Sequence, residues 1–237
     1  MKSYFNRHLK DKTFETPFKL QEYVSKQLGY NNLIKTTRTY LRYCEHFETL
    51  PIEVIVKYRK FLKQRKVKQD FHVPTDQEVI ENLNKIRNNP KLEIVYLVLA
   101  TSGIRYCECL EFLKTFDKTK FEIHKNYAVY SISKTRNTKT INNIYLPLPI
   151  YHKLKHVTNT YDSLRQRFKE KKCSFSLKYL RKWHYNFLIY QGVPESVSDF
   201  IQGRTNKSVS ANHYLARSQQ AGFWYEKIVE KLEIMFV

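Results

Sequence analysis

Cationic side chains and a tyrosine follow one another at close spacings within residues 176–214. Lys178 and Arg181 are three residues apart, so on a helix both side chains project from the same face. A Gly-Arg step ends at Arg204, and Tyr214 follows it. Apolar residues in the same stretch would seat its helices in a core, which leaves the cations and the tyrosine to face a ligand. A phosphodiester bound by the cations and attacked by the tyrosine hydroxyl explains this set of residues.

A second candidate position is an arginine with a carboxylate beside it. Residues 92–100 are apolar on nearly every face, which would also suit a buried strand. The helix-length segments beside them predict a buried helix instead, which stops at Gly103. Arg105 follows this turn, and Glu108 lies three residues further on, so its carboxylate can hold the guanidinium from the same helix face. We expect Arg105 to bind the ligand with Glu108 supporting it. A purely structural salt bridge between these two residues is the alternative.

A third group of cations lies on a predicted β-hairpin. Residues 127–133 alternate between apolar and polar types, and residues 141–146 are strand-like again. The polar turn between them, K-T-R-N-T-K, carries Lys134, Arg136 and Lys139. We expect these three side chains at the tip of the hairpin to contact phosphates.

The composition indicates a polyanionic partner. The 237 residues include 42 Lys and Arg against 22 Asp and Glu, a formal net charge of +20 at pH 7. This surplus is self-repulsive unless a polyanion offsets it, and nucleic acid is the usual partner. A solvated basic surface and a membrane-surface protein are the alternatives. Since no apolar run can span a bilayer and residues 1–10 lack the apolar centre of a signal peptide, we expect a cytoplasmic protein that binds nucleic acid.

No cofactor or metal is expected. Cys107 and Cys109 alternate around a helix and make a poor zinc site, and no C-x-x-C occurs. The cysteines are better explained as small buried or half-buried apolar residues. The chain contains five glycines and no phosphate-binding loop of the G-x-x-x-x-G-K type, so nucleotide-dependent chemistry is not expected either.

The helical periodicity predicts two domains. Residues 1–16 are polar and basic and predict a flexible arm, residues 17–65 a small bundle of three or four helices, and residues 66–73 a linker. Residues 74–237 form the second domain, which begins at a helix capped by Thr75 with Glu78 three residues on. After the hairpin, helices are predicted over residues 149–157, 160–170, 177–190, 194–202, 208–217 and 220–233. The fold class is therefore mainly α, an α+β protein with one small sheet or hairpin.

The exposed faces of the 17–65 bundle carry almost only positive charge. Arg38, Arg42 and Lys60 are among these cations. A charged helix face is often simply solvated, but a single sign of charge favours contact with phosphates.

At this point the motifs resemble those of the tyrosine recombinases, the phage integrase family. T-S-G-I-R-Y-C-E-C-L, which contains Arg105, resembles the first arginine box of that family. The later stretch is similar to its H-x-x-R, G-H/W and tyrosine boxes, with 23 residues from Arg181 to Arg204 and ten from Arg204 to Tyr214. Lys178 and Arg204 stand where most members have histidine or tryptophan, a pattern that resembles the integrases of archaeal viruses and plasmids.

The resemblance implies a DNA breaking-rejoining fold over about residues 74–217 and a core-binding function for the helical bundle. It implies that Tyr214 attacks a DNA phosphate to give a 3′-phosphotyrosyl link, while the three arginines stabilise the negative charge that develops on the phosphate. Lys139 would be the general acid for the leaving 5′ oxygen, with Lys134 as the alternative, and Lys178 a further phosphate ligand or proton carrier. The three arginines are Arg105, Arg181 and Arg204.

The resemblance also implies partners. We expect double-stranded DNA at attachment sites and a homo-oligomer on DNA, a tetrameric synapse that integrates or excises a mobile element. The tail, residues 220–237, is either exchanged with a neighbouring protomer or packed on its own domain. Two alternatives remain: an enzyme that nicks and reseals one duplex, as type IB topoisomerases do, and a catalytically inactive DNA-binding relative.

Overall fold

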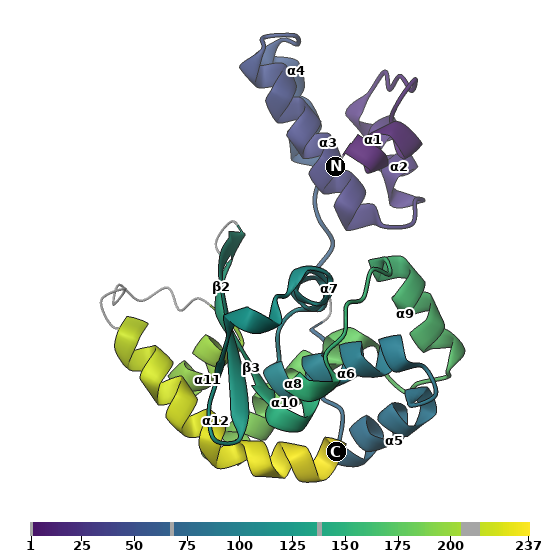
Figure 1. Ribbon diagram of the computed structural model, residues 1–237. Helices are drawn as coiled ribbons and strands as arrows, with labels where there is room; N and C mark the ends of the chain where they lie inside the picture. Colours follow the sequence, from purple (N-terminus) through teal and green to yellow (C-terminus); the bar gives the residue numbers. More distant parts are fainter. Residues whose placement is uncertain (1, 67–68, 137–138, 205–213) are drawn as a thin grey trace. The chain divides into compact units, whose positions relative to one another are not determined.

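The computed structural model describes residues 2–66, 69–136, 139–204 and 214–237. The chain divides into two compact units, Met1–Phe71 and His72–Val237, and the helices and strands of each are labelled in Figure 1. The division falls inside the segment predicted as a linker. His72 belongs to the second unit, where its backbone oxygen accepts a hydrogen bond from Lys182 Nζ at 3.2 Å.

The first unit consists of helices packed around a small apolar core. Its α2 begins with a proline after Thr16, whose side chain accepts from the Lys19 backbone N–H at 3.2 Å, a standard helix start. Leu33, Ile34 and Ile55 are fully buried at the centre of this core. The helices are α1 (Lys2–His8), α2 (Pro17–Ser25), α3 (Tyr30–His46) and α4 (Ile52–Phe61).

The prediction of a flexible arm over residues 1–16 was wrong. Part of this segment forms α1, and Leu9 is buried in the core of the first unit, with Phe5 and Phe14 packed against it. The Tyr58 hydroxyl also donates to the Phe14 backbone oxygen at 2.6 Å. Phe5 and Leu9 are four residues apart, as on one face of a helix, but two such positions are too few to establish a helical period.

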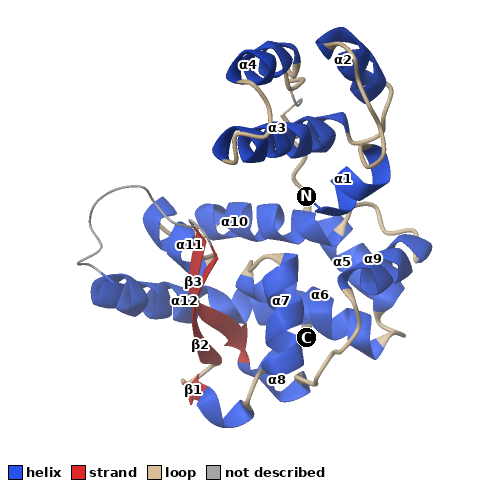
Figure 2. Ribbon diagram, turned by 90° about the horizontal axis from the view of Figure 1, so that it is seen from above, coloured by secondary structure: helices blue, strands red, loops and turns tan. Residues whose placement is uncertain are grey.

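The second unit is a set of helices around a three-stranded antiparallel sheet, and both units together make the protein mainly helical (Figure 2). The predicted capping box is present at the start of α5, where Glu78 N donates to Thr75 Oγ1 at 3.2 Å and Thr75 N to Glu78 Oε2 at 2.8 Å. The elements in order are α5 (Asp76–Ile86), α6 (Pro90–Ser102), α7 (Tyr106–Thr115), η1 (Lys118–Lys120), β1 (Phe121–Ile123), β2 (Tyr127–Arg136), β3 (Lys139–Pro147), α8 (Leu148–Lys153), α9 (Tyr161–Glu170), η2 (Leu177–Tyr179), α10 (Leu180–Tyr190), α11 (Glu195–Ile201) and α12 (Tyr214–Phe236).

The sheet is covered on both faces. β2 and β3 pair as the predicted hairpin, and the short β1, which the sequence did not predict, adds to the other edge of β2. Because alternate residues of a strand face opposite sides, Tyr127 and Tyr145 share one face, where their rings contact Tyr225 of α12 at 5.5 and 5.3 Å between centroids. On the other face the Tyr130 ring contacts Phe112 of α7 at 5.3 Å.

The C-terminal segment is a single helix, whereas the sequence predicted two helices with a break near residue 218. Gly222, which weakens a helix by its flexibility, lies inside α12. A Cβ atom at this position would be 2.9 Å from the hydroxyl of Tyr127, so the glycine serves a close approach of α12 to β2. Tyr225, Val229 and Leu232 are buried, and α12 therefore packs on its own unit.

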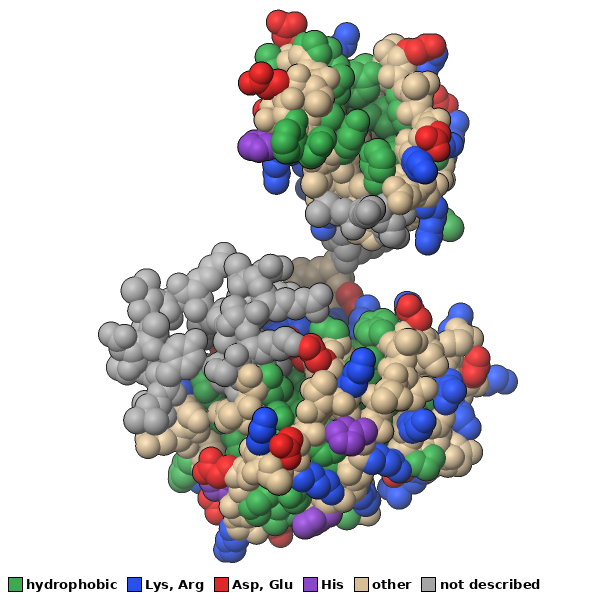
Figure 3. All heavy atoms as spheres, turned by 45° about the horizontal axis from the view of Figure 1, so that its top comes forward, with side chains coloured by type: hydrophobic (Ala, Val, Ile, Leu, Met, Phe, Trp, Pro, Cys, Tyr) green, Lys and Arg blue, Asp and Glu red, His purple; other side chains and the backbone are tan. Residues whose placement is uncertain are grey.

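The surface of the described residues is strongly basic in places and apolar in others. Figure 3 shows Lys and Arg side chains spread over one face of the second unit and hydrophobic side chains gathered on one face of the first. None of the helices in the described part of the chain has the length and hydropathy needed to cross a membrane.

Candidate active site

Two glycine turns form the frame of the site. α6 ends at Ser102, and Gly103 follows it with φ +63°. α11 ends at Ile201, and Gly203 follows with φ +62°. Both glycines adopt the left-handed conformation that non-glycine residues rarely reach, and both end a helix, as C-terminal glycines commonly do. The carbonyl oxygens of these two turns accept hydrogen bonds from the arginines of the site.

Arg105 lies immediately after the first turn and directly before α7. Its Nη1 donates to Glu108 Oε1 at 2.8 Å and its backbone N–H to Glu108 Oε2 at 3.0 Å. Its Nη2 donates to the Gly203 backbone oxygen, 98 residues away in the chain, at 3.2 Å. Glu108 thus holds both the backbone and the guanidinium of Arg105, which supports the predicted pairing, while the bond to Gly203 links Arg105 to the second turn.

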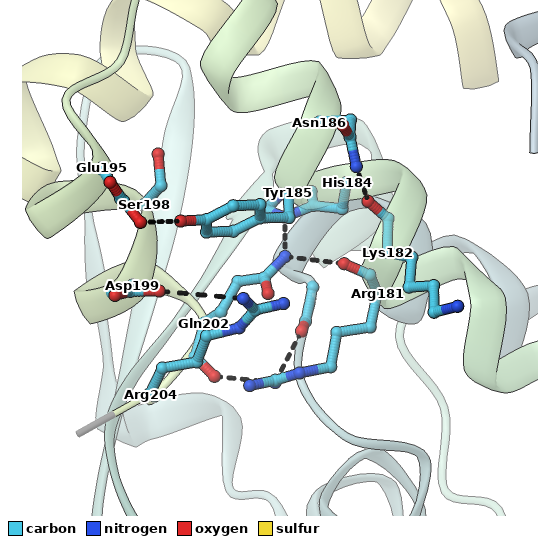
Figure 4. Close-up of polar contacts among 12 residues, drawn as sticks. Arg181, Lys182, His184, Tyr185, Asn186, Glu195, Ser198, Asp199, Gln202 and Arg204 are labelled. Carbon is cyan, nitrogen blue, oxygen red and sulfur yellow. Dashed lines mark hydrogen bonds and ion pairs between the residues drawn. The ribbon is translucent and has the colours of Figure 1, made fainter. Parts of the chain in front are cut away.

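Arg181 lies at the start of α10 and joins the two turns. Its Nη1 donates to the Gly103 oxygen at 2.9 Å and to the Gln202 oxygen at 2.7 Å (Figure 4). A guanidinium has five N–H groups, and these two bonds to described residues use two of them. Burial, and then the charges of Arg105 and Arg204, lower the pKa of Arg181 to about 9, and the side chain remains protonated at neutral pH.

Arg204 leaves the second turn and lies against a half-buried carboxylate and an aromatic ring. Its Nη1 is 3.8 Å from Asp199 Oδ1, and its guanidinium carbon lies 4.1 Å from the centroid of the Tyr185 ring. The Tyr185 hydroxyl donates to Glu195 Oε1 at 3.2 Å. Burial raises the pKa of Asp199, and the charge of Arg204 opposes this shift. The stack of a guanidinium on a tyrosine ring is a favourable cation–π geometry.

The three arginines therefore meet at one place although they come from three separate helix ends. Each guanidinium is hydrogen-bonded or ion-paired to other described residues, and among these residues Glu108 and Asp199 offset only part of the positive charge. Guanidiniums in a partly desolvated site suit an anion with several oxygens, because the planar fork can donate to two oxygens together. The arrangement can stabilise the additional negative charge of a phosphate under attack.

Lys178 lies close to Arg181 in the sequence, and its predicted role as a phosphate ligand or proton carrier stays a prediction. It lies in η2 directly before α10 and is exposed, with its Nζ 4.8 Å from the centroid of the Tyr179 ring. Lys182 lies over the same ring at 5.0 Å. Contacts among the described residues do not join Lys178 to the three arginines.

The remaining predicted site residues of the second unit are placed only by their backbones. Lys134 and Arg136 belong to β2, and Lys139 is the first residue of β3, paired in register with Arg136. Tyr214 is the first residue of α12. The side chains of these four residues lie outside the described part of the structure, so their roles stay predictions.

The predicted DNA contacts of the first unit are exposed. Arg38 and Arg42 project from α3 and Lys60 from α4. A neighbouring cation has a structural role instead, since Arg59 Nη1 donates to Glu45 Oε1 at 3.1 Å. The run of positive charge in this unit is therefore only partly available to a ligand.

Sequence reasoning missed several residues next to the arginines. His184 and Gln202 are both fully buried, and Asp199 lies beside Arg204. The sequence predicted His184 to be a surface residue, because a single histidine next to a motif usually is. Its position three residues after Arg181 was a weak sign, since that spacing puts both on one helix face. Within the described residues, no cluster of His, Cys, Asp and Glu could hold a metal ion.

Comparison with known proteins gives one family match. Residues 71–231 match the model of the archaeal phage integrases. No curated protein matches the sequence.

Solved structures with a similar arrangement are distant in sequence. An integrase from mycobacterium phage Brujita is 10% identical with a TM-score of 0.48, over 94% of this chain and 84% of that one. The XerH site-specific recombinase bound to difH substrate in a pre-cleavage complex is 12% identical with a TM-score of 0.49, over 95% and 73%. The XerA recombinase is 12% identical with a TM-score of 0.40, over 97% and 88%. Because the family model covers most of the sequence, the chain belongs to the archaeal phage integrases, in agreement with the resemblance of its motifs to tyrosine recombinases.

Proposed function

We propose that this protein is a site-specific DNA recombinase that cuts and rejoins DNA through a covalent tyrosine intermediate. The observation that carries the proposal is the meeting of Arg105, Arg181 and Arg204 at the two glycine turns. Three guanidiniums held close together repel one another, and this arrangement is favourable in a working site only when an anion joins them. The family match and the formal charge of +20 support DNA as that anion.

In the proposed reaction Tyr214 loses its hydroxyl proton to solvent, and its ionised oxygen attacks a backbone phosphorus. A bond forms between the tyrosine oxygen and phosphorus, the bond from phosphorus to the 5′ oxygen breaks, and the 5′ oxygen takes up a proton. The products are a 3′-phosphotyrosyl link and a free 5′ hydroxyl. Attack by the 5′ hydroxyl of another strand reverses the chemistry and rejoins the DNA. Because the link conserves the bond energy, the reaction requires no nucleotide.

The arginines act by charge in this reaction. They bind the nonbridging oxygens of the phosphate and stabilise the charge that builds up during attack. They also favour the ionised form of Tyr214 as nucleophile, since neighbouring cations lower the pKa of a phenol. Lys139, with Lys134 as the alternative, donates the proton to the leaving 5′ oxygen, and Lys178 contacts the phosphate or carries a proton.

Recombination of two duplexes requires four active sites. We therefore expect a homotetramer on paired attachment sites, which integrates or excises a mobile element. Arg38, Arg42 and Lys60 of the first unit and Arg136 of the hairpin would contact the DNA backbone outside the cleavage site.

The experiment captures the covalent intermediate and identifies the target sequence in the same step. Wild-type protein is incubated with linear duplexes that carry a randomised central segment, and complexes that resist detergent are recovered and sequenced. The recovered sequence is then rebuilt as a nicked duplex from which the released strand diffuses away. The proposal expects an adduct that blocks exonuclease digestion from the 3′ end of the cleaved strand and leaves a 5′ hydroxyl that polynucleotide kinase can label.

Two substitutions test the nucleophile. Tyr214→Phe should abolish the adduct while binding to the recovered duplex persists. Tyr190→Phe is the matched control, because Tyr190 is 85% exposed on α10, and it should react like the wild type. Absence of any adduct with wild-type protein, or an unchanged adduct with Tyr214→Phe, would contradict the proposal. Relaxation of supercoiled plasmid without a site requirement would favour a topoisomerase instead.

A further inference from the structure

Two buried polar side chains connect the glycine turns from behind the arginines. Gln202 directly follows the last residue of α11, His184 lies in α10, and both are fully buried. Gln202 Nε2 donates to the Arg181 backbone oxygen at 3.0 Å and to His184 Nδ1 at 2.9 Å. His184 Nε2 lies 3.1 Å from the Thr101 backbone oxygen (Figure 4). A continuous set of hydrogen bonds thus runs from the end of α6, through α10, to the end of α11.

The hydrogen bonds assign the protonation of this pair. A backbone oxygen only accepts, so His184 Nε2 must carry the hydrogen that lies between it and Thr101. His184 Nδ1 is then an acceptor in the neutral ring and needs a donor, which is the amide nitrogen of Gln202. The opposite orientation of the Gln202 amide would place its oxygen against two acceptors. The observed orientation is favoured even though Gln202 Oε1 is buried without a hydrogen-bond partner among the described residues.

Gln202 and Arg181 are joined by two reciprocal hydrogen bonds, each from the side chain of one residue to the backbone oxygen of the other. The Gln202 side chain donates to the Arg181 backbone oxygen, while Arg181 Nη1 donates to the Gln202 backbone oxygen at 2.7 Å. The first bond fixes the end of α11 against the start of α10, and the second uses that fixed oxygen to orient the guanidinium. A shift of Gln202 would therefore move the acceptor of Arg181 and, two residues on, the backbone of Arg204.

His184 acts in the same way on the first turn. Its ring is bonded to Thr101, two residues before Gly103, whose oxygen is the other acceptor of Arg181 at 2.9 Å. The ring also fills the space beside that glycine, since a Cβ atom at Gly103 would lie 2.3 Å from His184 Nδ1 and 2.6 Å from Gln202 Nε2. His184 and Gln202 therefore pack closely against Gly103, which lies two residues before Arg105 in the chain.

We propose that His184 and Gln202 are positioning residues that set the relative placement of Arg105, Arg181 and Arg204 for the attacked phosphate. The inference rests on the proposed function, because it concerns the rate of that same reaction. Neither side chain touches the substrate. His184 is neutral and fully enclosed, so it transfers no proton in the reaction, and its contribution is the geometry of the two turns.

The first experiment examines the wild-type protein and needs no DNA. Histidine labelled with ¹⁵N is observed by NMR between about pH 5 and 8, and the His184 signals are assigned from their loss in His184→Asn. The proposal expects a neutral ring with hydrogen on Nε2 throughout this range. A His184 ring that gains a second proton near its ordinary pKa of about 6.5, or carries hydrogen on Nδ1, overturns it.

The second experiment compares variants by single-turnover adduct formation on saturating DNA, using the duplex recovered by covalent capture. The amide oxygen of asparagine is as many bonds from Cβ as His184 Nδ1, so His184→Asn can still accept from Gln202. The amide nitrogen of glutamine is as many bonds from Cβ as Nε2, so His184→Gln keeps only the bond to Thr101. Gln202→Met keeps the length of the side chain and removes both donated bonds.

The expected order of rates follows from these bonds. Gln202→Met and His184→Gln should slow adduct formation by about 100-fold, the cost of a small misplacement of reacting groups, while DNA affinity stays within about threefold. His184→Asn should retain a rate within about tenfold of wild type. Trp183→Phe is the matched control, because it removes a different buried hydrogen bond of α10, from Trp183 Nε1 to Asp76 Oδ1 at 2.7 Å, without touching either turn.

The outcomes separate positioning from simple stability. All variants are first tested for unfolding, and Trp183→Phe should lose stability yet react within about threefold of wild type, since it leaves the arginine geometry unchanged. If Gln202→Met reacts as fast as wild type, or if Trp183→Phe is slowed as much as Gln202→Met, the positioning role is wrong. Absence of an adduct with wild-type protein would instead contradict the proposed function. The NMR measurement would still test whether His184 is neutral with its hydrogen on Nε2, as the hydrogen bonds to Gln202 and Thr101 require.

Discussion

Acid should destabilise the second unit through the buried ring of His184. Burial, followed by the charges of Arg181 and Arg204, lowers the pKa of this imidazole to about 3, and its hydrogen bond to Thr101 acts in the opposite direction. In the unfolded chain the pKa is about 6.5. Between these two pKa values the unfolded state binds a proton that the folded state does not bind. The contribution of His184 to the free energy of unfolding is therefore fully present above about pH 6.5 and is lost as the pH decreases towards 3.

The magnitude follows from the difference between the two pKa values. A difference of roughly three and a half units corresponds to about 5 kcal/mol once the pH is below both values. Between pH 7.5 and pH 5 the unfolded chain takes up most of its proton while folded His184 takes up almost none, which costs about 2 kcal/mol of the free energy of unfolding. That loss is a large fraction of the stability of an ordinary domain.

Urea unfolding followed by tryptophan fluorescence measures this effect. The two tryptophans of the chain, Trp183 and Trp224, both belong to the second unit, so the signal reports on that unit. His184→Gln should be less stable than wild type at pH 7.5 but should lose about 2 kcal/mol less on going to pH 5. His152→Gln, which replaces an exposed histidine, should keep the wild-type pH dependence. Parallel losses in wild type and His184→Gln would refute the reasoning.

Three further predictions concern the glycine turn, the central arginine and the charge of the protein. Gly103→Ala should lower the free energy of unfolding of the second unit by about 2 kcal/mol or more beyond the loss caused by Gly192→Ala. Both glycines have positive φ, but a Cβ atom would meet the side chains of His184 and Gln202 only at Gly103. Equal losses in urea unfolding would contradict this prediction. Arg181→Lys should lower adduct formation by about 100-fold or more, since one ammonium cannot span both carbonyl oxygens and a phosphate; a rate near that of wild type would show that the fork is not needed. Affinity for duplex DNA should fall by roughly 1,000-fold between about 50 and 200 mM salt in a filter-binding titration, and a flat salt response would argue against binding through phosphates.

Local patterns in the sequence were sufficient for many of the elements. Helix α6 was predicted although its residues are apolar on all sides, because the segments beside it have the length of helices. The capping box of Thr75 and Glu78 marked the start of α5 correctly. Strand β1 was not predicted, since three residues are too few to show alternation. The break predicted near residue 218 was wrong, because α12 runs from Tyr214 to Phe236 and its buried residues pack against the rest of the second unit.

The candidate site, too, could be predicted only in part from the sequence. The sequence alone was sufficient to predict the order of the arginines, the pairing of Arg105 with Glu108, the excess of positive charge and the family resemblance. Each of these depends on residue identity and on short spacings. Only the tertiary structure decided that the turns at Gly103 and Gly203 lie together and that their carbonyl oxygens orient Arg105 and Arg181. It also decided that His184 is buried and neutral. Hydrogen bonds to backbone oxygens and the loss of water around a side chain depend on segments about 100 residues apart, which no local pattern records.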